Sequence, residues 1–220
     1  MSGFRSTHRV GIPPIASCWP TFGRKLALVA LCLLAAGASS GPQAAEEESL
    51  AGRLLVAKPS MPDPRFAHTV IYMVAHDKQG AMGLIVNRPV GHIPFDALLE
   101  GLDQPAEELE GDVTVHFGGP VAPSSGFVLH SPEFVLEGSR VVDDKLAFTT
   151  NTNILTAMAE GRGPEKALLA FGYSGWGPGQ LETEMNRDDW FTIPFDISLV
   201  FTDEPAQIWK RAMAREEIEL

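Results

Sequence analysis

Cysteine is almost absent from this chain. Its 220 residues include two cysteines, Cys18 and Cys32, and both lie before residue 49. The rest of the sequence therefore has no disulfide, no thiolate for a metal site and no cysteine nucleophile. Stability has to come from buried apolar surface, and a chain of this length with 45% hydrophobic residues can form a sizeable core.

Positive charge is also scarce outside the N-terminal segment. The chain has 17 basic and 28 acidic residues, and the first 45 residues hold four basic residues and no acidic one. Subtracting those four leaves 13 basic against 28 acidic residues, so the remainder carries a formal charge of −15. Such a domain repels phosphate backbones unless its cations cluster, and the sequence contains no such cluster. Direct binding to nucleic acid is therefore disfavoured.

Long apolar runs are missing except for one, which covers residues 26–36. Two basic residues precede it, and small residues follow at the spacing that a signal peptidase prefers. The run is too short to span a bilayer. We therefore interpret residues 1–48 as an N-terminal extension that is either signal-peptide-like or untranslated, because translation can start downstream. Residues 49–220 are predicted to form one domain with no transmembrane span.

Short β-branched and aromatic runs, separated by turn residues, dominate that domain. Their composition and alternation predict strands over residues 54–57, 68–76, 84–90, 113–117, 126–130, 139–150 (two strands around a turn), 166–174, 190–194 and 197–201. Helical spacing of apolar residues predicts helices over residues 93–102, 151–161, 178–190 and 203–219. The expected fold class is α+β, a single domain with a curved, mixed, mostly antiparallel β-sheet flanked by helices.

The segment HFGGPVAPSSGFVLH, residues 116–130, is the first group of polar and glycine residues that could form a site. Gly118 and Gly119 permit positive φ angles and the next proline fixes a turn, so we interpret it as a turn between strands, with a ligand-contacting loop as the alternative. It is not a phosphate loop, because no Lys-Ser/Thr follows. His116 and His130 approach each other if the strands pair, but zinc needs a third ligand and no suitably spaced residue supplies it.

The segment GYSGWGPGQLETE, residues 172–184, is the second such group. A nucleophile elbow needs glycine two residues to either side of Ser174, and Trp176 occupies one of those places. Glu182 and Glu184 do not share a helix face, and they would repel a pyrophosphate. Two interpretations stay open: a strand-to-helix loop whose aromatic residues cover the core, or the mouth of an aromatic-lined pocket.

No complete catalytic constellation is present, so we expect no catalytic residue, no cofactor and no metal. The main hypothesis is a non-enzymatic module that binds a protein or a small-molecule partner. The alternative is a hydrolase-like enzyme with a pocket between the 116–130 and 172–184 segments and His130 as general base. The candidate ligand-binding residues are Asn87, Gly118, Gly119, His130, Tyr173, Trp176, Gln180 and Glu182.

Three motifs together resemble the YqgE/AlgH family of bacterial proteins. They are GRLLVAKPSMPDPRFAHTVIYMVAHDKQGAMGLIVNRPV, HFGGPVAPSSGFVLH and GYSGWGPGQLETE, and the resemblance runs from about Leu50 to Lys210. Ser174 stands where alanine is common in the family, and Lys58 where methionine is common. The resemblance implies an α+β fold with a bent sheet flanked by helices.

The resemblance also bears on function and location. The family has no established biochemical activity, and one branch is described as a candidate transcriptional regulator linked to alginate production. Members are generally taken to be cytoplasmic, which favours a cytoplasmic location here. The alternative is an exported, periplasmic domain if residues 24–38 act as a signal peptide.

Overall fold

The structure is a computed structural model that describes residues 49–104 and 109–219. The N-terminal extension, residues 1–48, lies outside the described residues, so its interpretation as a leader or an untranslated segment stays a prediction. The described elements, in chain order, are β1 (Leu54–Ala57), β2 (Val70–Asp77), β3 (Gly80–Ile85), β4 (Pro89–Pro94), α1 (Phe95–Gly101), β5 (Asp112–Phe117), β6 (Val121–His130), β7 (Arg140–Val141), β8 (Ala147–Thr149), α2 (Asn153–Ala159), β9 (Ala167–Trp176), α3 (Gln180–Asn186), β10 (Trp190–Ile193), α4 (Ile197–Val200) and α5 (Pro205–Glu219).

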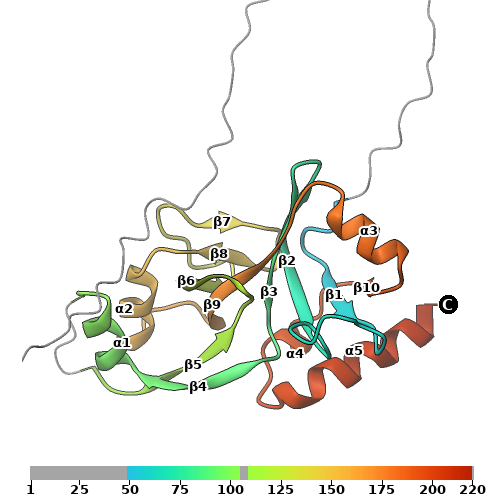
Figure 1. Ribbon diagram of the computed structural model, residues 1–220. Coiled ribbons are helices and arrows are strands. Elements are labelled where there is room, and N and C mark those ends of the chain that lie inside the picture. The colour runs from blue at the N-terminus through green and yellow to red at the C-terminus, as the bar shows by residue number, and fades with distance from the viewer. Residues whose placement is uncertain (1–48, 105–108, 220) are drawn as a thin grey trace, which may run out of the picture. The chain divides into compact units, whose positions relative to one another are not determined.

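The strands form one curled, mixed sheet, which confirms the predicted fold class. Its order is β10-β1-β2-β3-β9-β6-β8-β7, and the β4–β5 ribbon joins it at β9 (Figure 1). Strand β9 pairs in parallel with β5, whereas the other described pairings are antiparallel. Half of the antiparallel pairs, namely β1–β2, β2–β3, β4–β5 and β7–β8, join strands that are neighbours in sequence, as short turns favour.

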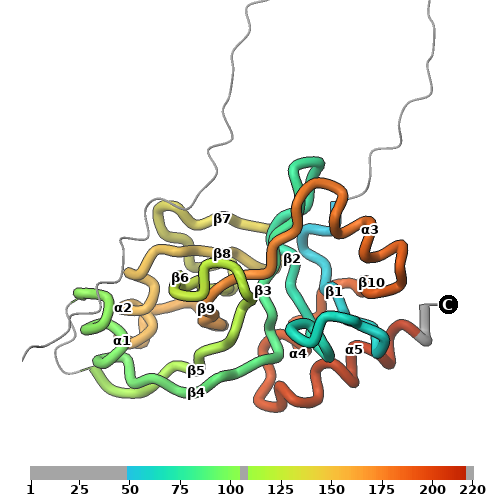
Figure 2. Tube along the Cα trace, viewed as in Figure 1, coloured from blue at the N-terminus to red at the C-terminus, as the bar shows by residue number. Residues whose placement is uncertain are grey.

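Strand β9 joins the two halves of the sheet. Its first residues pair with β5 and its last residues with β3, while β6 occupies the opposite edge (Figure 2). Leu168 and Ala170 point into the core shared by both halves. Tyr173 also points into this core, although strict alternation would place residue 172 there, so the alternation shifts by one residue. Gly172 lies at the shift with a φ of +73°. A residue in the left-handed conformation allows the side-chain alternation to shift by one position. Strand β9 therefore keeps its apolar side chains on the inner face in both halves of the sheet.

Each face of the sheet is covered by its own layer. The inner face carries residues from both halves of the sheet and packs against α4 and α5 through Leu199, Val200, Ile208 and Ala212. The outer face of β1-β2-β3 is covered by α3 and the segment 58–69, and the outer face of β5-β9-β6 by α1 and α2 (Figure 1). Of the helices among the described residues, none has the length and apolar content needed to cross a membrane.

One predicted strand was wrong. Residues 197–201 form the short helix α4 instead, which begins after Asp196. The Asp196 side chain accepts a hydrogen bond from the Ser198 N–H at 2.7 Å, which is the interaction of a helix N-cap. A five-residue apolar run fits a buried strand and a buried helical turn equally well, and the Asp196 cap favours the helical turn.

Two strand boundaries also differ from prediction. The strand predicted over residues 84–90 ends at Ile85, as part of β3, and Pro89 begins β4, an edge strand where the missing N–H of proline is tolerated. Strand β6 begins at Val121 rather than residue 126, with an irregular register between Val121 and Gly126. The turn predicted within residues 116–130 is therefore confined to residues 118–120.

Candidate functional site

The two glycine-rich segments cross each other through their backbones. A Cβ atom on Gly118 would lie 2.2 Å from the Gly172 carbonyl oxygen, and one on Gly119 would lie 2.2 Å from the Tyr173 carbonyl carbon. A Cβ on Gly172 would in turn lie 2.2 Å from the Gly119 carbonyl oxygen. No side chain fits at these distances, so backbone contact explains the glycines at positions 118, 119 and 172. We call residues 118–119 and 172–173 the glycine crossing.

Hydrogen bonds complete the glycine crossing. The Gly118 N–H donates to the Phe171 carbonyl at 2.8 Å, and the Gly118 carbonyl accepts from the Ile85 N–H at 3.0 Å. The buried Ser174 hydroxyl donates to the same carbonyl at 3.3 Å, so this serine has a local partner. Tyr173 packs edge-on against Phe127, with the ring centroids 5.7 Å apart, and Phe127 in turn stacks on Phe148 at 5.6 Å.

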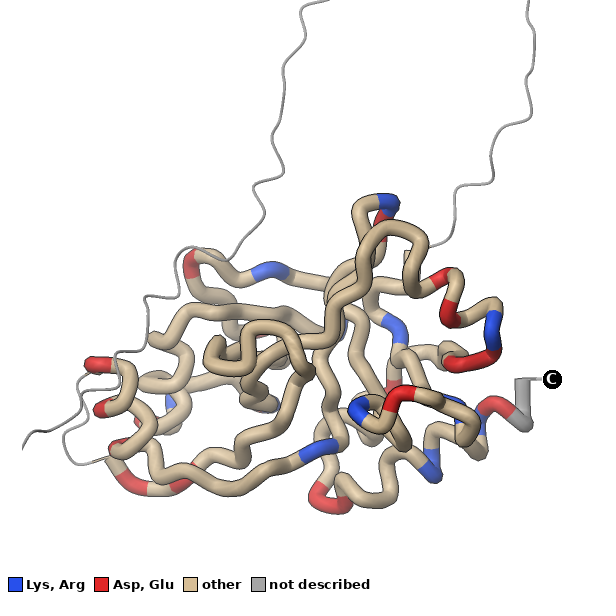
Figure 3. The backbone as a smooth tube through the Cα atoms, viewed as in Figure 1, with Lys and Arg blue, Asp and Glu red and all other residues tan. Residues whose placement is uncertain are grey.

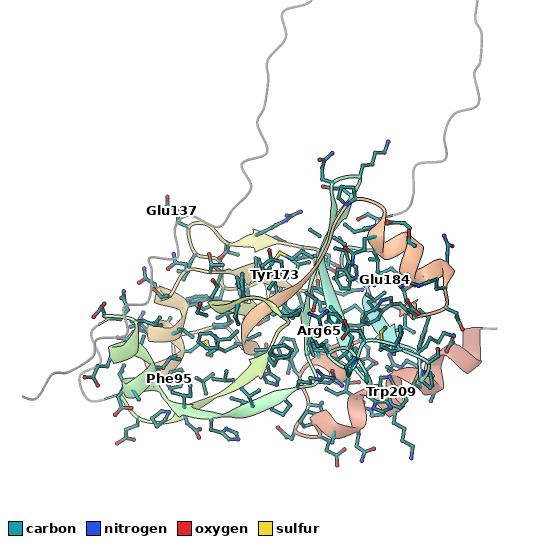
Figure 4. The ribbon with its side chains drawn as sticks, viewed as in Figure 1. Arg65, Phe95, Glu137, Tyr173, Glu184 and Trp209 are labelled. Carbon is teal, nitrogen blue, oxygen red and sulfur yellow. The ribbon has the colours of Figure 1, made fainter. Side chains whose placement is uncertain are left out.

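Trp176 and Gln180 are bound to a glutamate on α3. The Trp176 and Trp190 indole N–H groups both donate to Glu184 Oε2 at 2.9 Å, and the Gln180 amide donates to Oε1 at 2.9 Å. Figure 4 shows Glu184 on α3, near the end of the sheet that β10 forms. Glu184 thus closes the aromatic cluster over β1, β2 and β3, which favours the interpretation that these aromatic residues cover the core.

Glu182 takes a different partner from Glu184. Its Oε1 lies 2.6 Å from His76 Nε2, while His76 Nδ1 accepts the Leu50 N–H at 3.0 Å. Because Nδ1 is an acceptor, a neutral His76 ring carries its proton on Nε2 and donates it to Glu182. Burial opposes ionisation of Glu182, but its own backbone N–H and His76 outweigh burial and hold its pKa below the usual value.

Asn87 and its neighbour Arg88 hold the segment before β2. The Asn87 side chain accepts from the Val70 N–H at 2.9 Å and donates to the His68 carbonyl at 2.8 Å. The Arg88 guanidinium donates to the Ala67 carbonyl at 2.8 Å, and burial lowers the pKa of Arg88. These contacts replace the backbone pairing that the irregular segment cannot make for itself.

His130 lies away from the glycine crossing. It is the last residue of β6, pairs with Ala167, and is fully buried. Its Nδ1 donates to the Ser131 carbonyl at 3.0 Å, and burial lowers its pKa, so the ring is neutral at pH 7. Strand β9 lies between β5 and β6, so His116 and His130 do not meet across a strand pair. The described residues contain no group of three or more metal-ligating side chains.

The structure therefore brings three of the eight candidates together at the glycine crossing, namely Gly118, Gly119 and Tyr173. Trp176, Gln180 and Glu182 lie around the start of α3, whereas Asn87 and His130 lie elsewhere. Each has an intramolecular role in the fold. Ligand binding by these residues stays a prediction.

A cavity of about 670 Å³ lies at the end of three strands, and residues 116–130 and 172–184 take no part in its lining. Ser131 follows β6, Lys166 precedes β9, and Pro194 follows β10. We call this space the end cavity. Its lining residues are Ser131, Pro132, Asp144, Lys145, Glu165, Lys166, Pro194, Phe195, Asp196, Ile197 and Arg215.

The end cavity has an apolar wall and a charged rim. Pro132, Pro194, Phe195 and Ile197 supply the apolar surface, and the Lys145 ammonium lies 5.7 Å from the centre of the Phe195 ring. The rim holds three cations and three carboxylates. Asp196 and Arg215 form an ion pair, whereas four rim residues have no salt bridge among the described residues: Asp144, Lys145, Glu165 and Lys166.

Tyr72, which contacts the wall residue Phe195, has a buried hydroxyl without a partner among the described residues. Tyr72 is fully buried, its ring contacts Phe195 edge-on at 5.6 Å, and its hydroxyl has no hydrogen bond within the described residues. Burial, and then the charge of Asp143, raise the pKa of Tyr72 far above its ordinary value, so the hydroxyl keeps its proton.

Sequence reasoning missed the end cavity, because five separate segments contribute to it and none carries a recognisable motif. Asp196 is the one residue with a usable signal, since an acidic residue before a short apolar run is an N-cap pattern. That pattern predicts a helix start, however, and says nothing about a cavity.

Comparison with known proteins agrees with this geometry. The model of a family described as AlgH-like matches residues 54–220. A UPF0301 protein of Cereibacter sphaeroides is 47% identical over 161 residues, covering 73% of this chain and 88% of the relative. A UPF0301 protein of Methylococcus capsulatus is 44% identical over 162 residues, covering 74% of this chain and 88% of the relative.

Two solved structures share the fold. The solution structure of the AlgH protein from Pseudomonas aeruginosa matches with a TM-score of 0.65 at 38% identity, over 80% of this chain and 91% of that one. A crystal structure from Corynebacterium diphtheriae matches with a TM-score of 0.59 at 22% identity, over 77% of this chain and 87% of that one, and shows the fold alone. The chain therefore belongs to the AlgH-like, or UPF0301, family.

Proposed function

We propose that this domain is a non-enzymatic binding module and that the end cavity is its ligand site. The observation that carries the proposal is the combination of an apolar wall with a rim of both charge signs where five segments converge. Ligand sites typically have volumes of roughly 300–1,000 Å³, apolar walls and a few polar groups that orient the ligand. The end cavity has all three properties.

The polar groups of the cavity support binding rather than catalysis. The Ser131 hydroxyl donates to Glu133 at 2.7 Å and also lies 3.3 Å from the Lys166 carbonyl, so it faces a carboxylate rather than a base poised to activate it. The lining contains no histidine and no thiol. Glu133 is an ionised acceptor, since the Ser131 hydroxyl and the Glu165 N–H lower its pKa.

The proposed role is regulatory, in line with the family resemblance, and acts through a protein or small-molecule partner rather than through DNA. The formal charge of −15 outside the first 45 residues disfavours contact with phosphates. Figure 3 shows cations interspersed with acidic residues, without a basic stripe on the face in view. A gel-shift assay at physiological salt is expected to show no duplex binding, and a steep salt dependence of binding would contradict this part of the proposal.

We place the protein in the cytoplasm, with export as the alternative. The N-terminal mass of the protein isolated from its native cell decides between them. A start near Ser39 means cleavage after Ala38 and a site outside the cytoplasm. A start upstream of Ala36, or at an internal initiation site in the soluble cytoplasmic fraction, supports the cytoplasmic placement.

The cavity itself is tested with anilinonaphthalene sulfonate, a dye that fluoresces on apolar surfaces. Ile197 lines the cavity with 43% of its surface exposed, so Ile197→Trp fills the space from an exposed position. Val90→Trp is the matched control, because Val90 is 66% exposed on β4 and does not line the cavity. We expect dye binding that is lost in Ile197→Trp and kept in Val90→Trp. Equal binding by both variants contradicts the proposal.

A further inference from the structure

We propose that His76 is a pH-sensitive latch for the segment through which the chain enters the domain. The neutral ring holds Leu50, and the protonated ring releases it. We call residues 49–53, which precede β1, the entry segment. None of them lines the end cavity, so this inference goes beyond the proposed function.

The entry segment depends on His76 for its side-chain anchor. The Leu50 N–H donates to His76 Nδ1 at 3.0 Å in a partly buried bond, and the Leu50 side chain packs against the apolar cluster over β1, β2 and β3. The Ser49 hydroxyl donates to the His76 carbonyl at 2.8 Å, but this second bond is exposed to water. The ring nitrogen is therefore the main polar contact that keeps Leu50 in place.

The contact between Leu50 and His76 requires a neutral ring. A backbone N–H can only donate, so Nδ1 has to offer a free lone pair. Protonation of the ring puts a hydrogen on Nδ1, and two donors then face each other across 3.0 Å. The His76 side chain is only 7% exposed, so the new proton finds no solvent while Leu50 stays in place. The protonated ring therefore loosens the entry segment at Leu50.

Glu182 on α3 favours the protonated ring from the other side. Its Oε1 lies 2.6 Å from His76 Nε2, which carries a proton in both charge states of the ring. Burial raises the pKa of Glu182, but its own backbone N–H and His76 outweigh burial and hold this pKa below the usual value. The carboxylate is therefore still ionised when His76 takes up a proton, and the resulting ion pair offsets the lost contact with Leu50.

The other charged side chains on the surrounding elements are engaged elsewhere. On α3, Glu184 accepts from two indole N–H groups, and in the entry segment Arg53 donates to a hydroxyl on β10. At the end of β2, Asp77 accepts a backbone N–H of the β2–β3 turn, in which Lys78 lies, and β3 carries no ionisable side chain. Glu182 is therefore the charged group that sets the response of the ring.

The test is hydrogen exchange of the Leu50 amide, followed by NMR on the full-chain protein and divided by the intrinsic rate at each pH. Between pH 8 and pH 5, where histidines change charge, we expect the protection factor to fall roughly tenfold, the effect of about one lost hydrogen bond. The Gly52 amide donates to the Met73 carbonyl at 2.8 Å and serves as the internal control, with protection that stays constant. An unchanged protection factor at Leu50, or an equal fall at Gly52, overturns the latch.

Two variants assign the pH response to His76 and Glu182. His76→Asn keeps an acceptor near the position of Nδ1 without a titratable ring, so we expect protection of Leu50 that does not depend on pH. His92→Asn is the matched control, because His92 is exposed on β4, and it is expected to behave as the parent protein. A fall in His76→Asn at the same pH as in the parent overturns the proposal.

Glu182→Gln keeps an acceptor for Nε2 but removes the charge that favours the protonated ring. We therefore expect the fall in Leu50 protection to move to lower pH in this variant. An unchanged midpoint overturns the proposal. This measurement tests the latch even if the His76→Asn protein does not fold.

Discussion

The glycine crossing and the end cavity are opposites in one domain. At the crossing, backbones touch, Gly118 is hydrogen-bonded through both its N–H and its carbonyl, and the glycines leave no room for a Cβ atom. At the end cavity, four charged residues lack ion pairs among the described residues, and the wall residue Phe195 contacts Tyr72, whose buried hydroxyl has no partner there. The glycines at the crossing thus serve packing, whereas the unpaired charges of the cavity lie where the sequence shows no motif.

The largest effect is expected at Gly172. A substitution there tests whether the lack of space for a Cβ atom, rather than the positive φ angle, requires glycine at the crossing. Gly172 and Gly138 have similar φ angles of +73° and +83°, but a Cβ meets a carbonyl oxygen at 2.2 Å in Gly172 and nothing within 4 Å in Gly138. Gly172→Ala is expected to lower the free energy of unfolding by about 4 kcal/mol and Gly138→Ala by about 1 kcal/mol. Urea titration measures both, and equal losses contradict the backbone-contact explanation.

A smaller loss is expected beside the crossing, at Glu184. Replacing it with alanine leaves the Trp176 and Trp190 indole N–H groups without their acceptor, which costs roughly 2–3 kcal/mol. Glu204→Ala is the control, because Glu204 is exposed at the start of α5. Thermal unfolding of both variants checks the prediction. A Glu184→Ala protein as stable as the control would show that the aromatic cluster does not depend on this carboxylate.

At Tyr72, which contacts the wall residue Phe195 of the end cavity, removal of a polar group is expected to stabilise the protein. Tyr72→Phe removes a buried hydroxyl that has no partner, so we expect a gain of about 1 kcal/mol in the free energy of unfolding without ligand. A gain in stability means that the fold does not depend on this hydroxyl. A loss of stability in urea titration would show that the Tyr72 hydroxyl has a partner in the folded protein, and would contradict the contrast drawn between the glycine crossing and the end cavity.

The smallest effect concerns acid stability at the cavity rim. Burial opposes ionisation of Asp196, but bonds from Arg215 and Ser198 outweigh it and lower its pKa below the usual 3.8. The carboxylate therefore contributes stability above the unfolded pKa, and this contribution is lost as pH falls through the lower folded pKa. Asp196→Asn is expected to cost about 1 kcal/mol or less at pH 7. The melting temperatures of Asp196→Asn and of the parent protein should converge as the pH falls from 7 to 2. A constant difference between them contradicts the lowered pKa of Asp196.

Much of the fold was predictable from the sequence. Alternation placed Leu54 and Val56 on one face of β1 and Leu55 and Ala57 on the other, and both faces are buried as expected for an apolar run. Residues 197–201 were mispredicted, because an apolar run of five residues has no period of its own. The boundaries around Pro89 and Val121 failed because edge position and strand irregularity depend on neighbouring strands.

The candidate site was predicted less well, for a related reason. The sequence identified glycines and aromatic residues that recur within short segments, and the structure gives those residues roles in packing. It could not show that Lys145, Lys166 and Phe195 share one cavity, because they are brought together by strand ends far apart in the chain.

The sequence by itself determined the fold class, the lack of cysteine chemistry in residues 49–220, the acidic balance and the family. These depend on composition and on local spacing, which the chain carries in every conformation. The tertiary structure alone decided that the glycine motifs cross through their backbones and that an apolar wall meets unpaired charges at the strand ends. Both depend on contacts between distant segments, and such contacts exist only once the curled sheet has formed.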